Sequence, residues 1–439
     1  MASPFPLIFF IAIISVSILF VLPVSSTSRN GLKQTSRGFR ATLRHVDSGR
    51  NLTGIERLRR GMKRGSYRLH RLSMAGGAER SDLKSMVHPG SGEFLMELSI
   101  GTPPSPFEAI VDTGSDLIWT QCKPCRSCFP QKTPIFDPEK SSSFSRLPCS
   151  DKLCSALPMR LCGDRGCDYS YSYGDYSTTE GAMATEKFTF DNKASTGKVA
   201  FGCGNDNEGS GFNQGAGLVG LGRGPLSLVS QLEQPKFSYC LTAIDGGGKS
   251  TLLMGSLAGG KTGNSSKVTT PLVKNPSQPS FYYITLEGIT VGETRLPVAE
   301  SAFKLSRDGS GGMIIDSGTT LTYLQTEAFA ALKSEFKKQT NLAVDESGST
   351  GLDLCFKLPS GAEEIDVPKL TFHFGGGADL NLPGENYVVA DKSYGVACLA
   401  MGSADGMSIF GNVQQQNMMV VHDLAKETIS FEPTNCDQL

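Results

Sequence analysis

The sequence predicts a mostly β protein built from two related lobes. Its 439 residues suit about two domains, or one large two-lobed body. Only 19% of the residues are charged while 50 are glycine, which argues against helical bundles and favours turn-rich β structure. The third observation is a weak internal repeat, in which an apolar run leads into Asp and then Gly in each half of the chain.

From residue 92 onward, short apolar runs alternate with turn residues. Strands are predicted at 94–100 and 107–111, separated by a turn rich in Gly and Pro. Helices are few, and the clearest is predicted at 327–338 with Thr326 as its N-cap. This order of elements is typical of a β-rich fold.

Charge is divided unevenly along a chain whose formal net charge is −1. No charged side chain occurs before Arg29. Residues 27–80 hold 14 Lys and Arg against three Asp and Glu, a net charge of +11, whereas residues 81–439 hold 28 basic and 40 acidic residues, a net charge of −12. We expect the basic segment to dock on the acidic body. The near-zero total is not the footprint of a nucleic-acid-binding protein, so no such partner is expected.

The N-terminal segment is nearly all apolar from Phe5 to Val24 and ends in small residues near Ser26. This pattern indicates a secretory signal peptide at 1–26, although a basic n-region is missing. An uncleaved membrane anchor is the alternative, because the run approaches the roughly 20 residues that span a bilayer. The signal is favoured because the sequence has no second apolar span and its cysteine content fits export. A secreted protein without stable membrane association is therefore expected.

Residues 27–80 are interpreted as a removable basic pro-segment. Apolar residues recur at helical spacing from Ile55 to Leu72, among arginines and lysines. A basic amphipathic helix is also typical of membrane-surface and calmodulin-binding elements. Its position behind a signal and ahead of an acidic body favours an intramolecular inhibitor. The lobes are then expected at 81–240 and 241–439.

The twelve cysteines all follow residue 121, and an even number in an exported chain indicates a disulfide framework. Cys122, Cys125 and Cys128 have a spacing that zinc ligands also use, but no His lies nearby to complete a tetrahedral site. No metal is therefore expected.

Four further cysteines have symmetric spacings of 5, 8 and 5 residues. The symmetry suggests nested pairing, with Cys149–Cys167 around Cys154–Cys162. This is one of three connectivities that four cysteines allow.

The internal repeat carries the chemistry. The segment AIVDTGS at 109–115 is echoed by MIIDSGT at 313–319, and each is followed about a hundred residues later by two apolar residues and Gly, at 218–220 and 409–411. One such motif occurs by chance as a turn, but two copies with matching surroundings are specific. Two halves that each end a strand in Asp can place Asp112 and Asp316 face to face.

These motifs resemble those of the pepsin-like aspartic proteases, and most of all the plant nepenthesin type, over about residues 90–436. The resemblance implies a bilobal pepsin-like fold with the active cleft between the lobes, and Asp112 and Asp316 as the catalytic pair. It further implies a monomeric acid endopeptidase that is made as a zymogen, acts on polypeptides and needs no cofactor.

The resemblance also gives roles to the residues that follow the aspartates, namely Thr113, Gly114 and Ser115, and Ser317, Gly318 and Thr319. The first residue of each set reaches across to lock the two loops together. The glycine lets the backbone approach the carboxylate. The third residue hydrogen-bonds the outer carboxylate oxygen.

Tyr173 and Gly174 match the family's flap, a hairpin that closes over bound peptide. An ordinary hairpin rich in tyrosine is the alternative, since Tyr171 is also close. Trp119, the single tryptophan, lies where the family places a Trp hydrogen-bonded to the flap Tyr; otherwise it is a core residue.

The insertion 122–167 is longer than that of pepsin and matches the nepenthesin type. That match implies six disulfides: Cys122–Cys125, Cys128–Cys203, Cys149–Cys167, Cys154–Cys162, Cys240–Cys436 and Cys355–Cys398. Residue 412 is Asn where many pepsins have Asp, which removes a charge near the second active loop.

Asn51 and Asn264 begin N-glycosylation sequons, of which Asn264 alone would outlast removal of the pro-segment. The glycine pattern at 215–220 fits a dinucleotide-binding fingerprint, but no βαβ unit follows. A catalytically silent relative acting as an inhibitor or binding protein is the other function class. Such relatives typically lose a catalytic Asp or the flap, and both are present here. The destination is expected to be extracellular or apoplastic, with the vacuole as the alternative.

Overall fold

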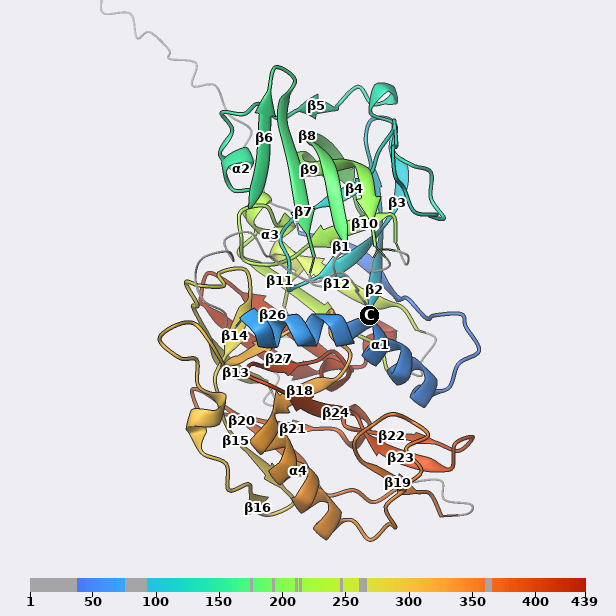
Figure 1. Cartoon of the computed structure of the whole chain (residues 1–439), viewed down its shortest axis with the longest axis vertical. Coiled ribbons are helices and arrows are strands. Elements are labelled where there is room, and N and C mark those ends of the chain that lie inside the picture. The colour runs from blue at the N-terminus through green and yellow to red at the C-terminus, as the bar shows by residue number, and fades with distance from the viewer. Residues whose placement is uncertain are drawn as a thin grey trace, which may run out of the picture. The chain divides into compact units, whose positions relative to one another are not determined.

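The computed structural model is rich in strands and poor in helices (Figure 1). It describes residues 38–75, 93–173, 177–191, 194–209, 212, 215–244, 248–259, 267–359 and 365–439. Within these ranges the chain forms 27 strands and four α-helices, so the mostly β prediction is confirmed. The expected signal peptide at 1–26 lies outside the described residues. No helix in the described part of the chain is long and apolar enough to cross a membrane.

The first lobe consists of strands that mostly pair antiparallel with their neighbours in the chain. The strands are β2 (Phe94–Ile100), β3 (Ser105–Asp112), β4 (Trp119–Gln121), β5 (Ser145–Arg146), β6 (Met159–Gly163), β7 (Gly166–Ser172), β8 (Thr178–Thr189), β9 (Ser195–Glu208) and β10 (Gly217–Gly220). Two short helices accompany them, α2 (Lys152–Ser155) and α3 (Leu228–Gln231). The β7–β8 hairpin is in register from Asp168↔Ala182 to Ser172↔Thr178.

The second lobe has smaller sheets and one longer helix. Its strands are β14 (Tyr282–Ile284), β15 (Leu286–Val291), β16 (Thr294–Arg295), β17 (Met313–Ile315), β18 (Thr322–Gln325), β19 (Cys355–Lys357), β20 (Leu370–Phe374), β21 (Ala378–Leu382), β22 (Val388–Asp391), β23 (Val396–Leu399), β24 (Met401–Ala404) and β25 (Ser408–Phe410). Strands β16-β15-β20-β21 form one sheet and β19-β23-β22 another.

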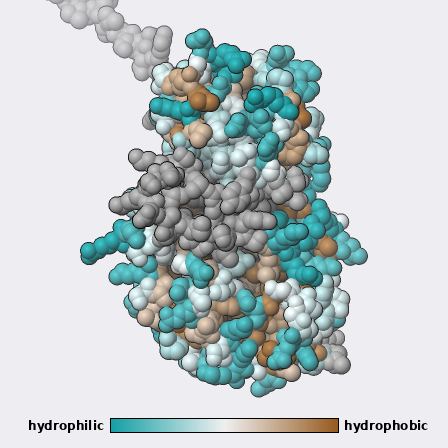
Figure 2. All heavy atoms as spheres, in the orientation of Figure 1, coloured by the Kyte–Doolittle hydropathy of each residue, from teal (hydrophilic) through white to brown (hydrophobic). Residues whose placement is uncertain are grey.

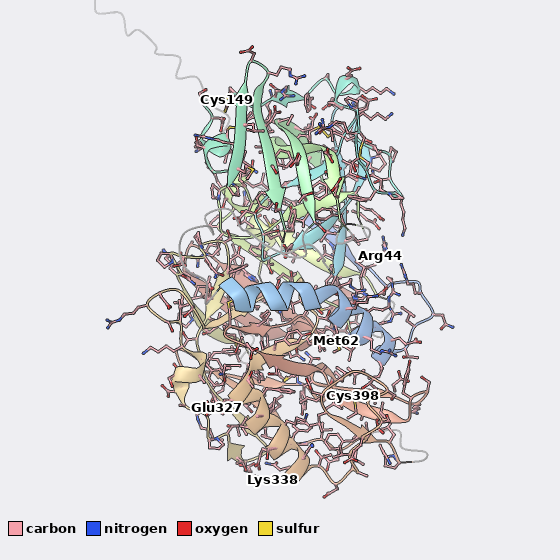
Figure 3. The ribbon with its side chains drawn as sticks, in the orientation of Figure 1. Arg44, Met62, Cys149, Glu327, Lys338 and Cys398 are labelled. Atoms are coloured by element: carbon pink, nitrogen blue, oxygen red, sulfur yellow. A yellow bond between two sulfur atoms is a disulfide. The ribbon has the colours of Figure 1, made fainter. Side chains whose placement is uncertain are left out.

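The helix of the second lobe, α4 (Thr326–Gln339), confirms the helix predicted at 327–338. Figure 3 labels Glu327 and Lys338 towards its two ends. The predicted N-cap is wrong by one residue. The Gln325 side chain accepts from the Glu327 N–H at 2.9 Å, whereas Thr326 Oγ1 bonds to Asp405 Oδ1 at 3.0 Å.

Six antiparallel strands from distant parts of the chain form a sheet in the order β1-β12-β11-β26-β27-β13. They are β1 (Phe39–His45), β11 (Lys236–Cys240), β12 (Ser250–Met254), β13 (Val268–Val273), β26 (Met418–Asp423) and β27 (Thr428–Pro433). Strand β1 also pairs with β2. The basic N-terminal segment therefore contributes a strand here as well as the expected helix, α1 (Gly54–Ala75).

Apolar side chains fill the interior of both lobes and of this sheet. Figure 2 shows mainly hydrophilic residues on the face that it draws, apart from the grey atoms. Among the described residues, two of the four exposed large apolar side chains lie on one strand, β6. They are Met159, which is 51% exposed, and Leu161, which is 66% exposed.

Six disulfides engage all twelve cysteines, and Cys240–Cys436 and Cys355–Cys398 agree with expectation. Cys122–Cys125 and Cys128–Cys203 were wrong, because the structure forms Cys122–Cys203 and Cys125–Cys128. Parallel pairing of β4 with β9 sets Gln121 opposite Gly204 and brings Cys122 to Cys203. The zinc alternative also fails, since all three sulfurs are in disulfides.

The nested pairs Cys149–Cys167 and Cys154–Cys162 were wrong too, because the structure forms the crossed pairs Cys149–Cys162 and Cys154–Cys167. Both crossed bridges span 13 residues, so the spacing symmetry fits them equally well. The β6–β7 hairpin sets Cys162 opposite Cys167. Cys149 and Cys154, before and within α2, then each bond to one strand of the hairpin. Figure 3 labels Cys149 in this region.

A fully buried histidine lies in the middle of the six-stranded sheet. His422 on β26 stacks on Phe237 with ring centroids 4.3 Å apart and meets the edge of Tyr282 at 4.7 Å. Neither ring nitrogen has a hydrogen-bond partner among the described residues. Burial and, to a smaller extent, the charge of Arg223 lower the pKa of His422 to about 3. The unfolded chain binds this proton near pH 6.5, so stability is lost as pH falls from about 6.5 towards 3.

Replacing His422 with Phe should remove this acid sensitivity. His422→Phe should have a higher free energy of unfolding than the wild type in acid, because the unfolded variant has no imidazole to protonate. The difference between variant and wild type should be about 2–3 kcal/mol larger at pH 4 than at pH 7. Thermal and denaturant unfolding at both pH values measure the difference. His373→Asn, at the partly exposed pair with Asp379, is the control. A gain of equal size at both pH values would contradict the assignment.

Candidate active site

Asp112 is the last residue of β3, and its side chain is fully buried. Strand β10 lies parallel beside β3 and sets Gly220 opposite Asp112. The Gly114 N–H donates to Asp112 Oδ1 at 3.1 Å. The predicted strand thus delivers the carboxylate into a loop whose own backbone binds it.

Asp316 follows β17 in the second half and is also buried. The Gly318 N–H donates to Asp316 Oδ1 at 2.9 Å, and Thr319 Oγ1 donates to Oδ2 at 2.5 Å. Strand β25 lies parallel beside β17 and sets Phe410 opposite Ile315. The two halves therefore repeat one arrangement.

The glycines downstream in the repeat have a steric reason. Strand β10 also pairs antiparallel with β4, and β25 with β18, so each passes between two strands of the loop that carries an aspartate. A Cβ on Gly220 would lie 2.3 Å from the Asp116 carbonyl carbon, and one on Gly411 would lie 2.1 Å from the Leu321 carbonyl oxygen. Only glycine fits at this close approach.

Hydrogen bonds join the two loops directly. The Ser317 N–H donates to Thr113 Oγ1 at 3.0 Å, and the two hydroxyl oxygens are 3.3 Å apart. Thr113 Oγ1 also lies 3.5 Å from Asp316 Oδ1, to which it donates a long hydrogen bond. Thr113 and Ser317 therefore contact each other across the two loops.

The third residues of the two loops differ. Thr319 bonds the outer oxygen of Asp316, as expected. Ser115 Oγ is buried without a hydrogen-bond partner among the described residues, so the expected bond to Asp112 is not formed. The two loops are alike in backbone but not in the environment of the carboxylates.

Tyr173 follows β7 at the turn towards β8, and its N–H donates to the Ser177 carbonyl at 2.8 Å. Its ring is fully buried, with centroids 5.1 Å from Phe212 and 6.5 Å from Trp119. Burial raises the pKa of Tyr173 well above its usual value. The Trp119 indole N–H has no hydrogen-bond partner among the described residues, so the bond to Tyr173 that the resemblance implies is not formed. Gly174 lies outside the described residues.

Two family models match most of the chain. One, described as xylanase inhibitor N-terminal, covers residues 94–256, and the other, xylanase inhibitor C-terminal, covers residues 281–433. Aspartic proteinase nepenthesin-1 of Nepenthes gracilis is 52% identical over 434 residues, which are 97% of this chain and 98% of the relative. The chain belongs to the nepenthesin type of pepsin-like aspartic proteases. It is an aspartic-type endopeptidase.

Other relatives agree with this membership. Nepenthesin-2 of the same plant is 49% identical over 444 residues, covering 99% of each chain. Among solved structures, edgp has a TM-score of 0.62 at 20% identity, covering 81% of this chain and 96% of that one. Soybean basic 7S globulin has a TM-score of 0.61 at 20% identity, covering 80% and 95%. At such identity the solved structures bear on the fold alone, and they support the pepsin-like class.

Sequence reasoning missed a buried glutamine that supports the second loop of this aspartic protease. The Gln415 side chain donates to the Phe410 carbonyl at 2.8 Å and the Gly411 carbonyl at 3.0 Å. Its neighbour Asn412 donates through Nδ2 to the Ser317 carbonyl at 3.0 Å, which an Asp side chain cannot do. Three successive glutamines at 414–416, beginning three residues after Gly411, were the available signal, since buried polar side chains need partners.

A second missed residue is Asp116, four positions after Asp112. Its carboxylate accepts from the Gly224 N–H at 2.9 Å and from Ser280 Oγ. Burial, which is the largest cause, and the charge of Asp112 raise its pKa above the usual value. The signal was an acidic residue followed directly by an apolar strand.

Thr113→Val should weaken the link between the loops while preserving side-chain size. It removes the acceptor of the Ser317 N–H, so kcat should fall about 10- to 100-fold through misplacement of the carboxylates. Thr113→Ser keeps the hydroxyl and should stay near wild type. Steady-state kinetics on a peptide substrate measure both variants. Equal activity in the two variants would show that the hydroxyl does not position the loops.

Proposed function

We propose that this protein is a secreted acid endopeptidase, made as a zymogen, in which Asp112 and Asp316 activate one water molecule. The observation that carries the proposal is the joining of the two aspartate loops by the hydrogen bond from Ser317 to Thr113. It supports a site in which carboxylates from both halves act together on a polypeptide. The close relatives named as aspartic proteinases support the same reaction.

The mechanism uses the electrostatics of paired carboxylates. Two carboxylates close together cannot both ionise cheaply, so the pair holds one proton over a wide acidic range. The ionised member takes a proton from water, and the protonated member donates a hydrogen bond to the scissile carbonyl. Water attack gives a tetrahedral gem-diol, and the proton taken from the water then passes to the peptide nitrogen as the C–N bond breaks, which releases a carboxylic acid and an amine. The shared proton belongs to the pair and not to either residue.

The neighbours of the pair have supporting roles in this mechanism. The N–H groups of Gly114 and Gly318 hold one oxygen of each carboxylate, which fixes the direction of the other. Tyr173 belongs to the proposed flap, and its packing on Trp119 and Phe212 gives the hairpin a defined position against the first lobe. A flap of this kind excludes water from a bound peptide.

Asp112→Asn and Asp316→Asn should each reduce turnover by at least about 10³-fold, because neither variant retains two carboxyl groups. Shape and hydrogen-bonding capacity are nearly conserved, so unfolding temperature and circular dichroism should stay close to wild type. Cleavage of a denatured protein at pH 3–5, with and without a statine-type inhibitor, measures the loss. Asp379→Asn, at a surface pair, is the matched control. Full activity in either purified active-site variant would refute the assignment.

We further propose that residues 1–26 are a signal peptide, residues 27–80 a pro-segment, and residues 81–240 and 241–439 the two lobes. The six disulfides support an oxidising, exported destination, either extracellular or vacuolar. Asn51, an exposed residue, is a proposed glycosylation site of the precursor. Asn264, proposed for the mature enzyme, lies outside the described residues.

The contacts of α1 support an inhibitory role for the pro-segment. Ile55 and Leu58 are fully buried in a cluster that includes Leu321 of the second aspartate loop. A Cβ on Gly61 would lie 2.1 Å from Thr320 Oγ1, so the helix packs directly against that loop. Met62, labelled in Figure 3, adds a partly buried contact to the same cluster.

Charge pairs give this docking its pH dependence. Arg64 bonds Glu93 at 2.7 Å and Asp47 at 2.9 Å, and His45 also contacts Glu93 at 3.1 Å. Burial raises the pKa of Glu93, but Arg64 and, to a smaller extent, His45 lower it by more than burial raises it. The pKa of Glu93 therefore lies well below its ordinary value. Within the segment itself, burial raises the pKa of Asp47, but Arg64 and Arg60 together lower it by more, so that it lies below its usual value. Stability from such carboxylates is present above about pH 4.5 and is lost as pH falls below it.

The precursor should therefore be stable and inactive at pH 7, then lose residues up to about 80 on acidification. Glu93→Gln mimics the protonated carboxyl, so it should release the segment at a higher pH than wild type. Activity and N-terminal sequence, measured against pH, test both expectations. The control is Glu108→Gln, at a partly exposed pair with Arg44, which should shift release less.

Two results would contradict this account of activation. A precursor as active at pH 7 as at pH 4, with the segment attached, would show that the segment is not an inhibitor. An unchanged pH of release in Glu93→Gln would remove Glu93 as the sensor. If the enzyme cleaves itself, Asp112→Asn should block or slow the processing.

A further inference from the structure

The carboxylate of Asp116 occupies a site that is built for it. Asp116 is 7% exposed, and each of its two oxygens has its own donor: the Gly224 N–H at 2.9 Å for Oδ1, and the Ser280 hydroxyl for Oδ2. Burying a carboxylate is costly, and the two hydrogen bonds offset part of this cost.

Alternating glycines make room for this carboxylate. A Cβ on Gly222 would lie 2.3 Å from Asp116 Oδ1, and a Cβ on Gly224 would lie 2.1 Å from Oδ2. Gly220, Gly222 and Gly224 are alternate residues of the segment 220–224. A Cβ on Gly220 would clash with the backbone of Asp116, and a Cβ on either of the other two would clash with its carboxylate. Neither Gly222 nor Gly224 has a positive φ, so close approach and not backbone conformation requires them.

The bonds of Asp116 connect the two halves of the molecule beside the aspartate loops. Ser280 belongs to the second half and lies two residues before β14, where Tyr282 pairs with Ile315, the residue before Asp316. The Arg223 N–H donates to the Ser280 carbonyl at 3.0 Å, and the Tyr282 hydroxyl donates to the Leu221 carbonyl at 2.6 Å. These bonds run from the loop of Asp112 to the strand beside Asp316.

We propose that Asp116 is a positioning residue for the catalytic pair, which ties the Asp112 loop to the strand next to Asp316 and uses its charge to set the working pH range. This inference rests on the proposed roles of Asp112 and Asp316. It gives an electrostatic function to a residue that touches neither substrate nor water in the mechanism above.

The charged and titratable groups around Asp116 determine the sign of its effect. Asp112 precedes it on the same loop, Tyr171 of β7 and Tyr282 of β14 both sense its charge, and Arg223 follows on the glycine-rich segment. Arg223 is itself paired with Glu427. A negative charge near Asp112 makes a second negative charge there less favourable. With Asp116 ionised, the catalytic pair keeps its shared proton to a higher pH. The corresponding position in the second loop is Thr320, which carries no charge.

Asp116→Asn separates charge from geometry. The amide oxygen can accept from the Gly224 N–H while the amide nitrogen donates to Ser280 Oγ, so the bridge is retained and the charge is lost. The alkaline limb of the profile of kcat/KM against pH should move to lower pH by about one unit, with KM little changed. The acid limb should stay in place, because the raised pKa of Asp116 favours its neutral form there. Asp116→Ala removes the bridge as well and should lower kcat about 10- to 100-fold.

Two further variants make the test decisive. Glu186→Gln changes a fully buried carboxylate that also accepts from a serine, Ser141 Oγ at 2.7 Å, and it should leave the pH profile unchanged. Ser280→Ala removes only the hydroxyl bond to Asp116 and should lower kcat, which keeps the test available if Asp116→Ala fails to fold. A wild-type pH profile in Asp116→Asn, or full kcat in Ser280→Ala, would overturn the proposal. Activity in Asp112→Asn would instead overturn the proposed catalytic pair.

Discussion

The hydrogen bond from the Ser317 N–H to Thr113 Oγ1 holds two halves of the chain against each other beside both aspartates. The strands around the two loops hold this contact in place. Each aspartate ends or follows a strand, β3 or β17, and each strand is braced by a parallel partner, β10 or β25. Beneath the loops, six antiparallel strands from both ends of the chain form a shared sheet, so a shift of one half would break main-chain bonds as well as the loop contact.

The repeat predicted this geometry because its information is local. An apolar run into Asp and Gly specifies a strand, a carboxylate and a turn whose N–H groups bind that carboxylate, and both copies behave in this way. The glycines at 220 and 411 recur in both copies because a Cβ there would clash with the backbone of the aspartate loop, at Asp116 and at Leu321. Ser115 did not follow its counterpart Thr319, because the direction of a hydroxyl depends on neighbours that a local motif does not specify.

Features that depend on how distant parts of the chain pack together could not be predicted from the sequence. The crossed disulfides depend on how Cys149 and Cys154, before and within α2, meet the two strands of the β6–β7 hairpin, and Cys122–Cys203 follows from the parallel pairing of β4 with β9; neither arrangement is encoded in cysteine spacing. The same holds for β1, whose partner strand β12 begins more than two hundred residues later. The sequence shows an acidic residue at position 116, but it does not show that the hydrogen-bond partner of Asp116 is Ser280, in the other half of the chain.

Acid acts differently on the β1 edge of the six-stranded sheet and on its middle. At the β1 end, the segment 38–75 has no cysteine, and its buried pairs at Asp47 and Glu93 lose their stabilisation as these carboxylates are protonated. In the middle, protonation of His422 also becomes costly at low pH, yet here Cys240–Cys436 joins β11 to the end of the β26–β27 hairpin that contains His422. A bridge that closes such a long loop stabilises by about 2–5 kcal/mol. The covalent link therefore protects the middle of the sheet, whereas no disulfide holds β1 or α1, whose charge pairs weaken in acid. In the activation that we propose, this difference lets one drop in pH free the N-terminal segment and leave the aspartate loops held together.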